Sequence, residues 1–352
     1  MRKLIIGATV AVALTALSGC VYSTQVADPG VWKFGNGYLV ASSDNFAPGT
    51  SKPSMPIYSM SSDQLQHSGS AGTRAGQIFL PNQEPGWVDR NQPLWAPEIE
   101  YIGGRLVAYY AAGCNGTSLC PKMANGHYST HRCIGMATAG GIGQSTGFTP
   151  VGQPFCTPAG DYDLIDPSVF TDDNGSNYLL FKRDPQAPGT KQIAITRLDG
   201  SGLNPALPTK KILSPGQPWE TTGTYTSVEA PTMIRRGDLY YLFYSGSLYK
   251  STRYGVGVAR CRVSQVGYTP MGCDFNSKGY AGWEYTGNPI LGGSQHTGGL
   301  CGIGHQDVSD NGAVLWYHAY PNSSCSGLRV LGAQRMDWGS DDWPHPVDGG
   351  TP

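Results

Sequence analysis

Acidic residues open several similar segments of the chain. Asp28 lies in "ADPGV", Asp166 in "IDPSVF" and Glu229 in "VEAPTM", each just before a short apolar run. A Gly-containing turn and a second, aromatic-rich run then follow. Carboxyl groups that a fold brings together can act as a general acid and a general base. Acids that recur in step with a repeat therefore indicate one shared site, provided that the repeat brings its segments together.

The repeat has five such segments. They begin at Ala27, Trp95, Ile165, Val228 and Ile303, so successive starts lie 68, 70, 63 and 75 residues apart. Short apolar runs around Gly-rich turns are hairpin signals, and a regular period of this length is typical of a β-propeller. The sequence therefore predicts an all-β fold, a single five-bladed β-propeller over residues 24–352. A large β-sandwich with unrelated hairpins is the alternative.

The first strand of each propeller blade lies nearest the central axis, and its start opens at one face. We therefore expect five residues to surround one shallow pit, namely Asp28, Glu98, Asp166, Glu229 and His305. Mutual repulsion makes such a gathering of acids unfavourable, and an active site is one reason to maintain it. Taken singly, the two Asp-Pro pairs could be turn formers, and His305 could be a buried structural histidine, as we interpret His318.

Composition narrows the classes of ligand. The 352 residues include 24 basic and 25 acidic ones, which gives a formal net charge of -1. That balance offers no electrostatic footprint for nucleic acid or for an anionic membrane surface. Only 14% of the residues are charged and 11% are aromatic, beside 49 Gly and 26 Pro. These proportions suit a turn-rich β-protein that handles polar, uncharged ligands.

The N-terminus resembles an export signal. Arg2 and Lys3 precede an apolar run that is too short to span a bilayer, so we predict a signal peptide at residues 1–23 and a secreted protein. The stretch "LSGC" resembles a bacterial lipobox that ends at Cys20, whose thiol would carry lipid. Ordinary cleavage nearby is the alternative. Nothing else in the sequence resembles a transmembrane segment.

Eight further cysteines form an even set, which in an exported chain indicates four disulfides. Pairing between neighbours keeps each bond within one repeat. It predicts the bonds Cys114–Cys120, Cys133–Cys156, Cys261–Cys273 and Cys301–Cys325. A zinc site is the competing interpretation, but the sequence has no Cys-x-x-Cys pair to favour it.

Five stretches carry a resemblance to a known family. In chain order, "ADPGV", "WAPEI", "IDPSVF", "VEAPTM" and "GIGH" resemble glycoside hydrolase family 43, as do "RCIGMATA", "WYHAY" and "LGAQRMDW". The likeness extends from about Ala27 to Pro344. Members of this family are five-bladed propellers, chiefly arabinofuranosidases, arabinanases and xylosidases that invert the anomeric centre.

The resemblance implies a role for each acid. Asp28 matches the general base that activates water, Glu229 the general acid that protonates the leaving oxygen, and Asp166 an acid that tunes and orients Glu229. Glycoside hydrolysis needs such a pair, with one carboxyl group ionised and the other protonated at the same pH. A third acid nearby raises the pKa of the proton donor by repulsion.

The resemblance also implies ligands around the acids. Trp95 would line the sugar site, Arg335 would reach sugar hydroxyls, and His305 would help to hold calcium or another metal ion at the axis. No organic cofactor is expected. The implied substrate is plant cell-wall polysaccharide, attacked by a monomer that releases L-arabinose from arabinan or arabinoxylan. A β-xylosidase and a non-catalytic sugar-binding propeller are the alternatives.

Overall fold

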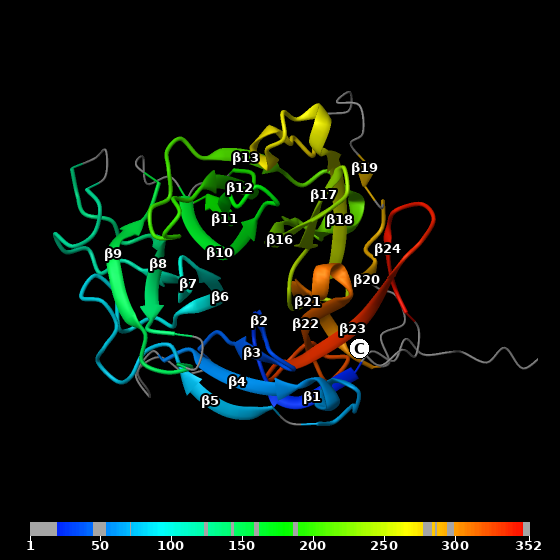
Figure 1. Ribbon diagram of the computed structural model, residues 1–352, viewed down its shortest axis with the longest axis horizontal. Coiled ribbons are helices and arrows are strands. Elements are labelled where there is room, and N and C mark those ends of the chain that lie inside the picture. The colour runs from blue at the N-terminus through cyan, green and yellow to red at the C-terminus, as the bar shows by residue number, and fades with distance from the viewer. Residues whose placement is uncertain are drawn as a thin grey trace, which may run out of the picture.

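The structure is a computed structural model that describes residues 20–44, 54–70, 72–122, 126–141, 144–157, 162–185, 189–276, 284–285, 287–293 and 299–347. Most strands belong to five antiparallel sheets, which we number as blades 1 to 5. Figure 1 shows these blades arranged around a common centre, as predicted for a five-bladed propeller.

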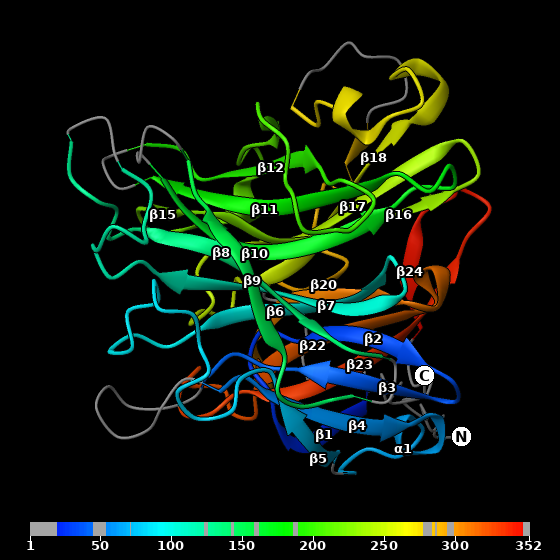
Figure 2. The ribbon, with the colours of Figure 1, turned by 60° about the vertical axis from the view of Figure 1, so that its left-hand side comes forward.

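Each of the first four blades is formed by strands consecutive in the sequence. Blade 1 contains β2 (Gly30–Phe34), β3 (Gly37–Ala41), β4 (Pro56–Ser61) and β5 (Thr73–Gln77). Blade 2 contains β6 (Trp95–Ile102), β7 (Arg105–Gly113), β8 (Arg132–Ala139) and β9 (Thr149–Phe155). Blade 3 contains β10 (Tyr162–Thr171), β11 (Asn177–Pro185), β12 (Gln192–Arg197) and β13 (Lys210–Leu213). Figure 2 shows β2, β3 and β4 side by side in one blade.

Blade 4 contains β16 (Val228–Arg236), β17 (Leu239–Gly246), β18 (Gly255–Arg262) and two short strands that pair with β18, β19 (Glu284–Tyr285) and β20 (Leu291–Gly292). Blade 5 contains β21 (Cys301–Ser309), β22 (Val314–Tyr320), β23 (Val330–Trp338) and β24 (Pro344–Pro346). Outside the blades lie the hairpin β14 (Thr221–Thr222) and β15 (Tyr225–Thr226), the helix α1 (Ser62–Leu65), and short 3-10 turns at Pro218–Glu220, Val263–Gln265, Pro270–Gly272 and Asp310–Gly312. None of the described helices is long and apolar enough to cross a membrane.

A strand from the start of the chain closes the ring. β1 (Cys20–Gln25) pairs with β23, so the first described residues complete blade 5. Cys20 and Tyr22 are buried there between blades 5 and 1. The first four residues of β1, Cys20–Ser23, therefore lie within the segment that the sequence predicts as a signal peptide. The predicted signal peptide otherwise lies outside the described residues.

Apolar residues fill the spaces between neighbouring blades. Strand β7 is buried from Leu106 onward, and its side chains alternate between the two faces of blade 2. Leu106 and Ala108 pack toward blade 1, whereas Val107 and Tyr109 pack toward blade 3. The same alternation in the other blades gives one apolar cluster at each of the five blade interfaces. These clusters hold the inner strands rigidly around the axis.

Three of the four predicted disulfides are confirmed: Cys133–Cys156, Cys261–Cys273 and Cys301–Cys325. The fourth prediction is wrong in this structure, since Cys114 and Cys120 are neighbouring buried thiols. Cys114 also lies within 4.8 Å of both sulfurs of the Cys133–Cys156 disulfide. That bond occupies two of the four sulfurs and so removes the ligand set that zinc would need.

Candidate active site

A cavity of about 170 Å³ opens at the axis where the inner strands begin. We call it the pit. Its lining contains five of the residues predicted for the site, Asp28, Trp95, Asp166, Glu229 and His305. Four others complete it: Tyr249, Tyr254, His318 and Arg329. The volume is below the roughly 300–1,000 Å³ of pockets for drug-sized ligands, so the pit suits a small group such as one sugar unit.

A backbone feature recurs where each inner strand enters the ring. Five residues there have a positive φ of 45–54°: Asp28, Ala96, Asp166, Ala230 and His305. All but the last precede a proline. Non-glycine residues in this region are strained by about 1–3 kcal/mol, and such strain gathers at functional sites. In blades 2 to 5 the pairing of the inner strand with its neighbour shifts register at this residue and then resumes, and the bulge directs Trp95, Asp166, Glu229 and His305 toward the pit.

This alignment corrects the predicted set of five residues. In blades 2 and 4 the strained position is an alanine, not the acid. Glu229 lies one residue before Ala230 and still lines the pit. Glu98 lies two residues after Ala96 and is buried in a smaller cavity further along the axis. The sequence repeat therefore located the strand entrances but missed this shift within each of the two blades.

Asp28 is surrounded by donors. The Arg329 Nη1 lies 2.6 Å and the His305 Nδ1 3.1 Å from its Oδ1, while the Ser43 hydroxyl donates to its Oδ2 at 2.6 Å. Burial by itself would raise the pKa of Asp28, but Arg329 and then His305 hold that pKa well below its usual range. Asp28 is therefore a carboxylate that stays ionised even at acidic pH.

His318 supports Asp28 in the neutral form. Its Nδ1 accepts the backbone N–H of Asp28 at 3.1 Å, and a nitrogen of Arg329 lies 3.5 Å from the same atom. Burial, followed by the nearby Arg329 charge, lowers the pKa of His318 to about 3. Two donors thus face one imidazole nitrogen, so this histidine is an acceptor that orients the Asp28 backbone, rather than an ion-pair partner.

Glu229 is held on the opposite side of the pit by two donors. The Lys182 ammonium lies 2.7 Å from its Oε2, and the Tyr254 hydroxyl donates to its Oε1 at 2.7 Å. Burial would raise the pKa of Glu229, but Lys182 and then the Tyr254 hydrogen bond lower it. Both carboxyl oxygens are therefore fixed in direction before any substrate arrives.

Asp166 has a different electrostatic environment. Its Oδ2 accepts the backbone N–H of Ala230 at 3.1 Å. Burial raises the pKa of Asp166 to about 6, with a further rise from Glu229 and an opposing effect of His305 and Lys182. Asp166 and Glu229 are thus two neighbouring buried acids that hold a proton more readily than Asp28 does.

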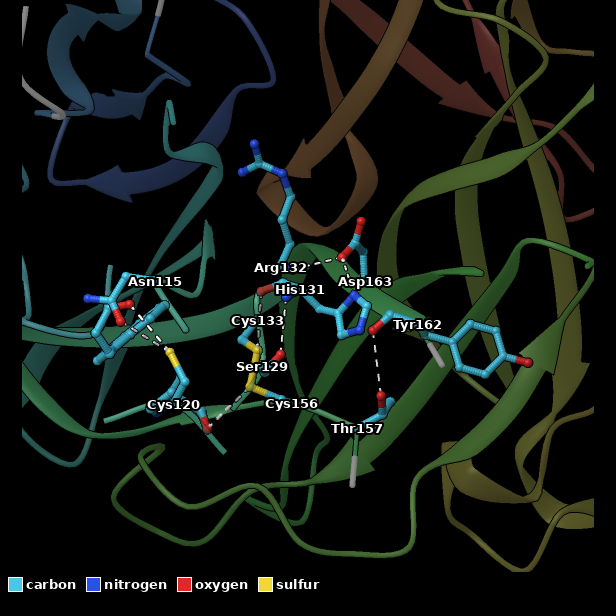
Figure 3. Close-up of a disulfide and its surroundings, with 12 residues drawn as sticks. Asn115, Cys120, Ser129, His131, Arg132, Cys133, Cys156, Thr157, Tyr162 and Asp163 are labelled. Carbon is cyan, nitrogen blue, oxygen red and sulfur yellow. Dashed lines mark hydrogen bonds and ion pairs between the residues drawn. A yellow bond between two sulfur atoms is a disulfide. The ribbon is translucent and has the colours of Figure 1, made fainter. Parts of the chain in front are cut away.

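Trp95 forms part of the rim of the pit and remains 37% exposed. The Arg132 guanidinium carbon lies 3.3 Å from its ring centroid, a close cation–π contact. Figure 3 shows the Arg132 side chain pointing away from the adjoining Cys133–Cys156 disulfide. Its guanidinium also donates to Pro93 O and Gln92 Oε1 at 3.1 Å each. The indole face is thereby fixed at the mouth of the pit.

Arg335 is not brought into the pit. It pairs with Val314, at the end of blade 5 remote from His305, and its exposed guanidinium lies 3.5 Å from Asp337. The reason is strand direction: β23 runs antiparallel to β22, so only its start lies near the pit. Arg329, just before that start, is the arginine that reaches Asp28.

The sequence did not predict several residues that line the pit or lie behind it. His318 was interpreted as structural, although it lies beside Asp28 in space. Lys182 follows the apolar run of β11 and carries no local signal of its role. Its separation of 47 residues from Glu229, and that of 301 residues between Arg329 and Asp28, show why local patterns missed them.

A second, smaller cavity lies along the axis beneath the pit, and His305 lines both. Its lining includes Glu98, Asp307, Ser168 and Thr232. Burial and then Asp307 raise the pKa of Glu98 well above its usual value, and burial raises that of Asp307 to about 6. The Ser168 hydroxyl is buried without a hydrogen-bond partner in the described chain.

These features fit a hard cation in the axial cavity. Carboxyl and hydroxyl oxygens are the donors that calcium prefers, and a positive ion would relieve the repulsion between Glu98 and Asp307. The group formed by Asp28, His305 and His318 is a less suitable site for a cation, although its donor atoms lie within 4.8 Å of one another. The Arg329 guanidinium already supplies the positive charge at Asp28.

Comparisons with known proteins agree with this architecture. Residues 19–344 match the model of "Glycosyl hydrolases family 43". The chain is 28% identical over 275 residues to an extracellular exo-alpha-(1->5)-L-arabinofuranosidase of Streptomyces avermitilis, covering 74% of this chain but only 51% of that relative. It is 27% identical over 289 residues to arabinan endo-1,5-alpha-L-arabinosidase A of Aspergillus niger, covering 76% and 77%.

Solved structures share the fold. A thermostable family-43 glycoside hydrolase superposes with a TM-score of 0.68 at 21% identity, covering 93% of this chain and 95% of that one. An endo-arabinanase from Bacillus licheniformis gives a TM-score of 0.63 at 22% identity, covering 93% and 99%. The family match spans nearly all of the described propeller and includes every residue of the pit. The chain therefore belongs to glycosyl hydrolase family 43.

Proposed function

We propose that this protein is an exported, inverting glycosidase that releases L-arabinose from arabinan or arabinoxylan. The observation that carries the proposal is the contrast within the pit, where Asp28 is ionised beside Arg329 and the Asp166–Glu229 pair lies opposite. Inverting hydrolysis needs one carboxylate and one proton donor, separated by enough room for water. A non-catalytic sugar-binding propeller would have no need of buried acids with such different environments.

Asp28 acts as the general base. It takes a proton from a water molecule that attacks the anomeric carbon, while Arg329 and His305 keep it ionised until that step. Glu229 donates its proton to the glycosidic oxygen, so the leaving sugar departs as an alcohol. Asp166 stabilises the protonated form of Glu229 by like-charge repulsion. Trp95 stacks against the sugar at the rim of the pit.

The axial cavity would hold a calcium ion through His305 and the oxygens of Asp307 and Glu98. When bound, the ion supplies positive charge and rigidity beneath the pit. His305 then keeps its ring in one orientation, and its Nδ1 continues to face Asp28. The backbone N–H of His305, which donates to Ser245 Oγ at 2.8 Å, fixes the same residue from the protein side.

The preference for arabinose follows the relatives, which include an exo-acting arabinofuranosidase and an endo-acting arabinan hydrolase. A pit that suits one sugar unit favours release of single residues. The test is a product profile of the secreted protein on arabinan, arabinoxylan and xylo-oligosaccharides, with Asp28→Asn as the control for contaminating activity. Arabinose as the main product supports the proposal. Xylose alone would contradict it, and no product from any of the three would favour a binding protein.

A further inference from the structure

Lys182 is a buried cation at the back of the pit. It lies on β11 with its side chain only 3% exposed, and its ammonium is 2.7 Å from Glu229 Oε2 and 3.2 Å from Asp184 Oδ2. Lysine is almost never fully buried unless it is paired. Burial lowers the pKa of an ammonium, but Glu229, Asp184 and Asp166 together raise that of Lys182 above its usual value. Lys182 is therefore a permanent positive charge.

The position of Lys182 excludes direct work on the sugar. Among the described residues, those that line the pit include Glu229 and Tyr254 but not Lys182. Glu229 thus lies between the ammonium and the space where substrate would bind. Lys182 can therefore influence the reaction only through the acids beside it, chiefly Glu229 at 2.7 Å and, through its charge, Asp166.

We infer that Lys182 is a positioning residue for proton transfer, which aims the Glu229 carboxyl group and stabilises the carboxylate left after its proton has gone. The inference rests on the proposed role of Glu229 as general acid. In that step the Glu229 O–H bond breaks, the proton joins the glycosidic oxygen, and the bond from that oxygen to the anomeric carbon breaks. The negative charge that remains on Glu229 lies 2.7 Å from the Lys182 ammonium.

Lys182 and Asp166 act on Glu229 in opposite directions. Asp166 and burial favour the protonated form of Glu229, whereas Lys182 and Tyr254 favour the ionised form. The pKa of Glu229 is lowered on balance and that of Asp166 is raised to about 6, so the pair as a whole keeps one proton and one negative charge. Several titratable and charged groups face the Asp166–Glu229 pair. They are His305 on β21, Lys182 and Asp184 on β11, Tyr225 on β15, Tyr254 just before β18, and Asp28 just before β2.

A neighbouring lysine offers a matched control. Lys191 lies 3.4 Å from Asp184 Oδ1, on the other oxygen of the carboxylate that Lys182 contacts. It belongs to the same charge cluster, but within the described chain it contacts Asp184 and the Tyr225 ring and not Glu229. A role confined to the stability of blade 3 would be shared by both lysines, whereas a role in proton transfer belongs to Lys182 alone.

The experiment compares Lys182→Met, Lys182→Arg and Lys191→Met on an arabino-oligosaccharide and on a nitrophenyl arabinoside. A sugar alkoxide needs the proton, whereas nitrophenolate leaves without it. Since hydrogen bonds to charged groups are strong, kcat/KM of Lys182→Met should fall roughly 10- to 100-fold on the oligosaccharide and only a few-fold on the aryl substrate. Lys182→Arg should restore most of the loss, and Lys191→Met should leave both rates unchanged. The alkaline limb of the pH profile should move to higher pH in Lys182→Met.

Two results separate the inference from the proposed function, with Glu229→Gln assayed beside the lysine variants. Equal losses of Lys182→Met on both substrates, with an unmoved pH limb, would overturn the inference alone if Glu229→Gln remains sensitive to the leaving group. If Glu229→Gln lost the same factor in kcat/KM on both substrates, the proposed function and the inference would both be contradicted. If Lys182→Met does not fold, Lys182→Gln serves in its place, since it keeps a hydrogen-bond donor but removes the charge.

Discussion

The two sides of the pit use the same acidic chemistry in opposite ways. On one side, which we call the Asp28 wall, a single carboxylate faces Arg329 and two histidines, His305 and His318. On the other, the Glu229 wall, two acids share one ammonium, that of Lys182. Burial raises the pKa of every acid in both walls. The number of cations per carboxyl group, rather than burial, therefore decides which side stays ionised and which side can carry a proton.

The largest losses of activity should come from substituting the two acids, and only the loss at Glu229 should depend on the leaving group. Asp28→Asn removes the base that every substrate needs, so kcat/KM should fall toward the upper end of the roughly 10²–10⁴-fold range for general acid–base catalysis on sugar and aryl substrates alike. Glu229→Gln should lose a comparable factor on arabino-oligosaccharides but retain far more activity on a nitrophenyl arabinoside. Steady-state kinetics on both substrates measure this. If each variant lost the same factor in kcat/KM on both substrates, the two walls could not be distinguished, and the assigned roles would be contradicted.

Removing the cation of the Asp28 wall should have the next largest effect. Arg329→Met deletes a charged contact of 2.6 Å to Asp28, so kcat/KM should fall about 10- to 100-fold, while Arg329→Lys should keep part of the activity. Arg335→Met is the matched control. Its side chain is 54% exposed, toward the far end of β23, the strand that follows Arg329. Surface changes of this kind usually shift stability by less than about 0.5 kcal/mol. A larger loss of kcat/KM in Arg335→Met than in Arg329→Met would show that Arg335, and not Arg329, serves the reaction.

The Glu229 wall should respond to pH through Asp166. Proton donation requires that this pair hold a proton, and the pKa of Asp166 is raised to about 6, so activity should fall as the pH rises through that region. Asp166→Asn removes the negative charge that opposes ionisation of Glu229. The pKa of Glu229 then falls, and the alkaline limb should move to lower pH, opposite to the shift expected for Lys182→Met. A profile of kcat/KM against pH that stays unmoved, or moves upward, would remove Asp166 from this role.

The smallest effect should come from the axial cavity beneath both walls. An ion that binds only the native state stabilises it by about 2.7 kcal/mol at 100 times its Kd, which corresponds to a fall in Tm of roughly 5 °C on chelation. Calcium should restore the original Tm, and His305→Gln should abolish the response. A Tm that chelator and calcium leave unchanged, measured by differential scanning calorimetry, would show that Glu98 and Asp307 share a proton instead of a cation.

Much of the fold could be predicted because its signals are local. Each blade opens with an apolar hairpin around a short turn, and the recurrence of that pattern gave both the number of blades and the place of their inner strands. The closing strand β1 could not be predicted in this way, because Cys20 pairs with Ala333, far away in the sequence, and no local pattern indicates that pairing.

The residues of the site likewise fall into those that have a local sequence signal and those that have none. Asp28 and Asp166 precede prolines and have a positive φ, so their local sequence marks them. The groups that set their charge come from other strands: Arg329 from the segment before β23 and Lys182 from β11. Which side chains reach the acids depends on how the blades pack. Arg335, for example, lies on β23 but at the end remote from the pit, whereas Arg329 lies just before the start of β23 and contacts Asp28. Local pattern therefore predicted the acids but not their partners.

The most direct test of the two-wall account is the configuration of the first product. If water is activated by the Asp28 wall on one face of the sugar while the Glu229 wall protonates the leaving oxygen, hydrolysis proceeds by a single displacement. Proton NMR of a reaction with a nitrophenyl α-L-arabinofuranoside should then show β-arabinose first, before mutarotation brings in the other anomer. Initial appearance of the α-anomer would mean that a carboxylate attacks the sugar itself, and it would contradict the role of Asp28 as the base that activates water.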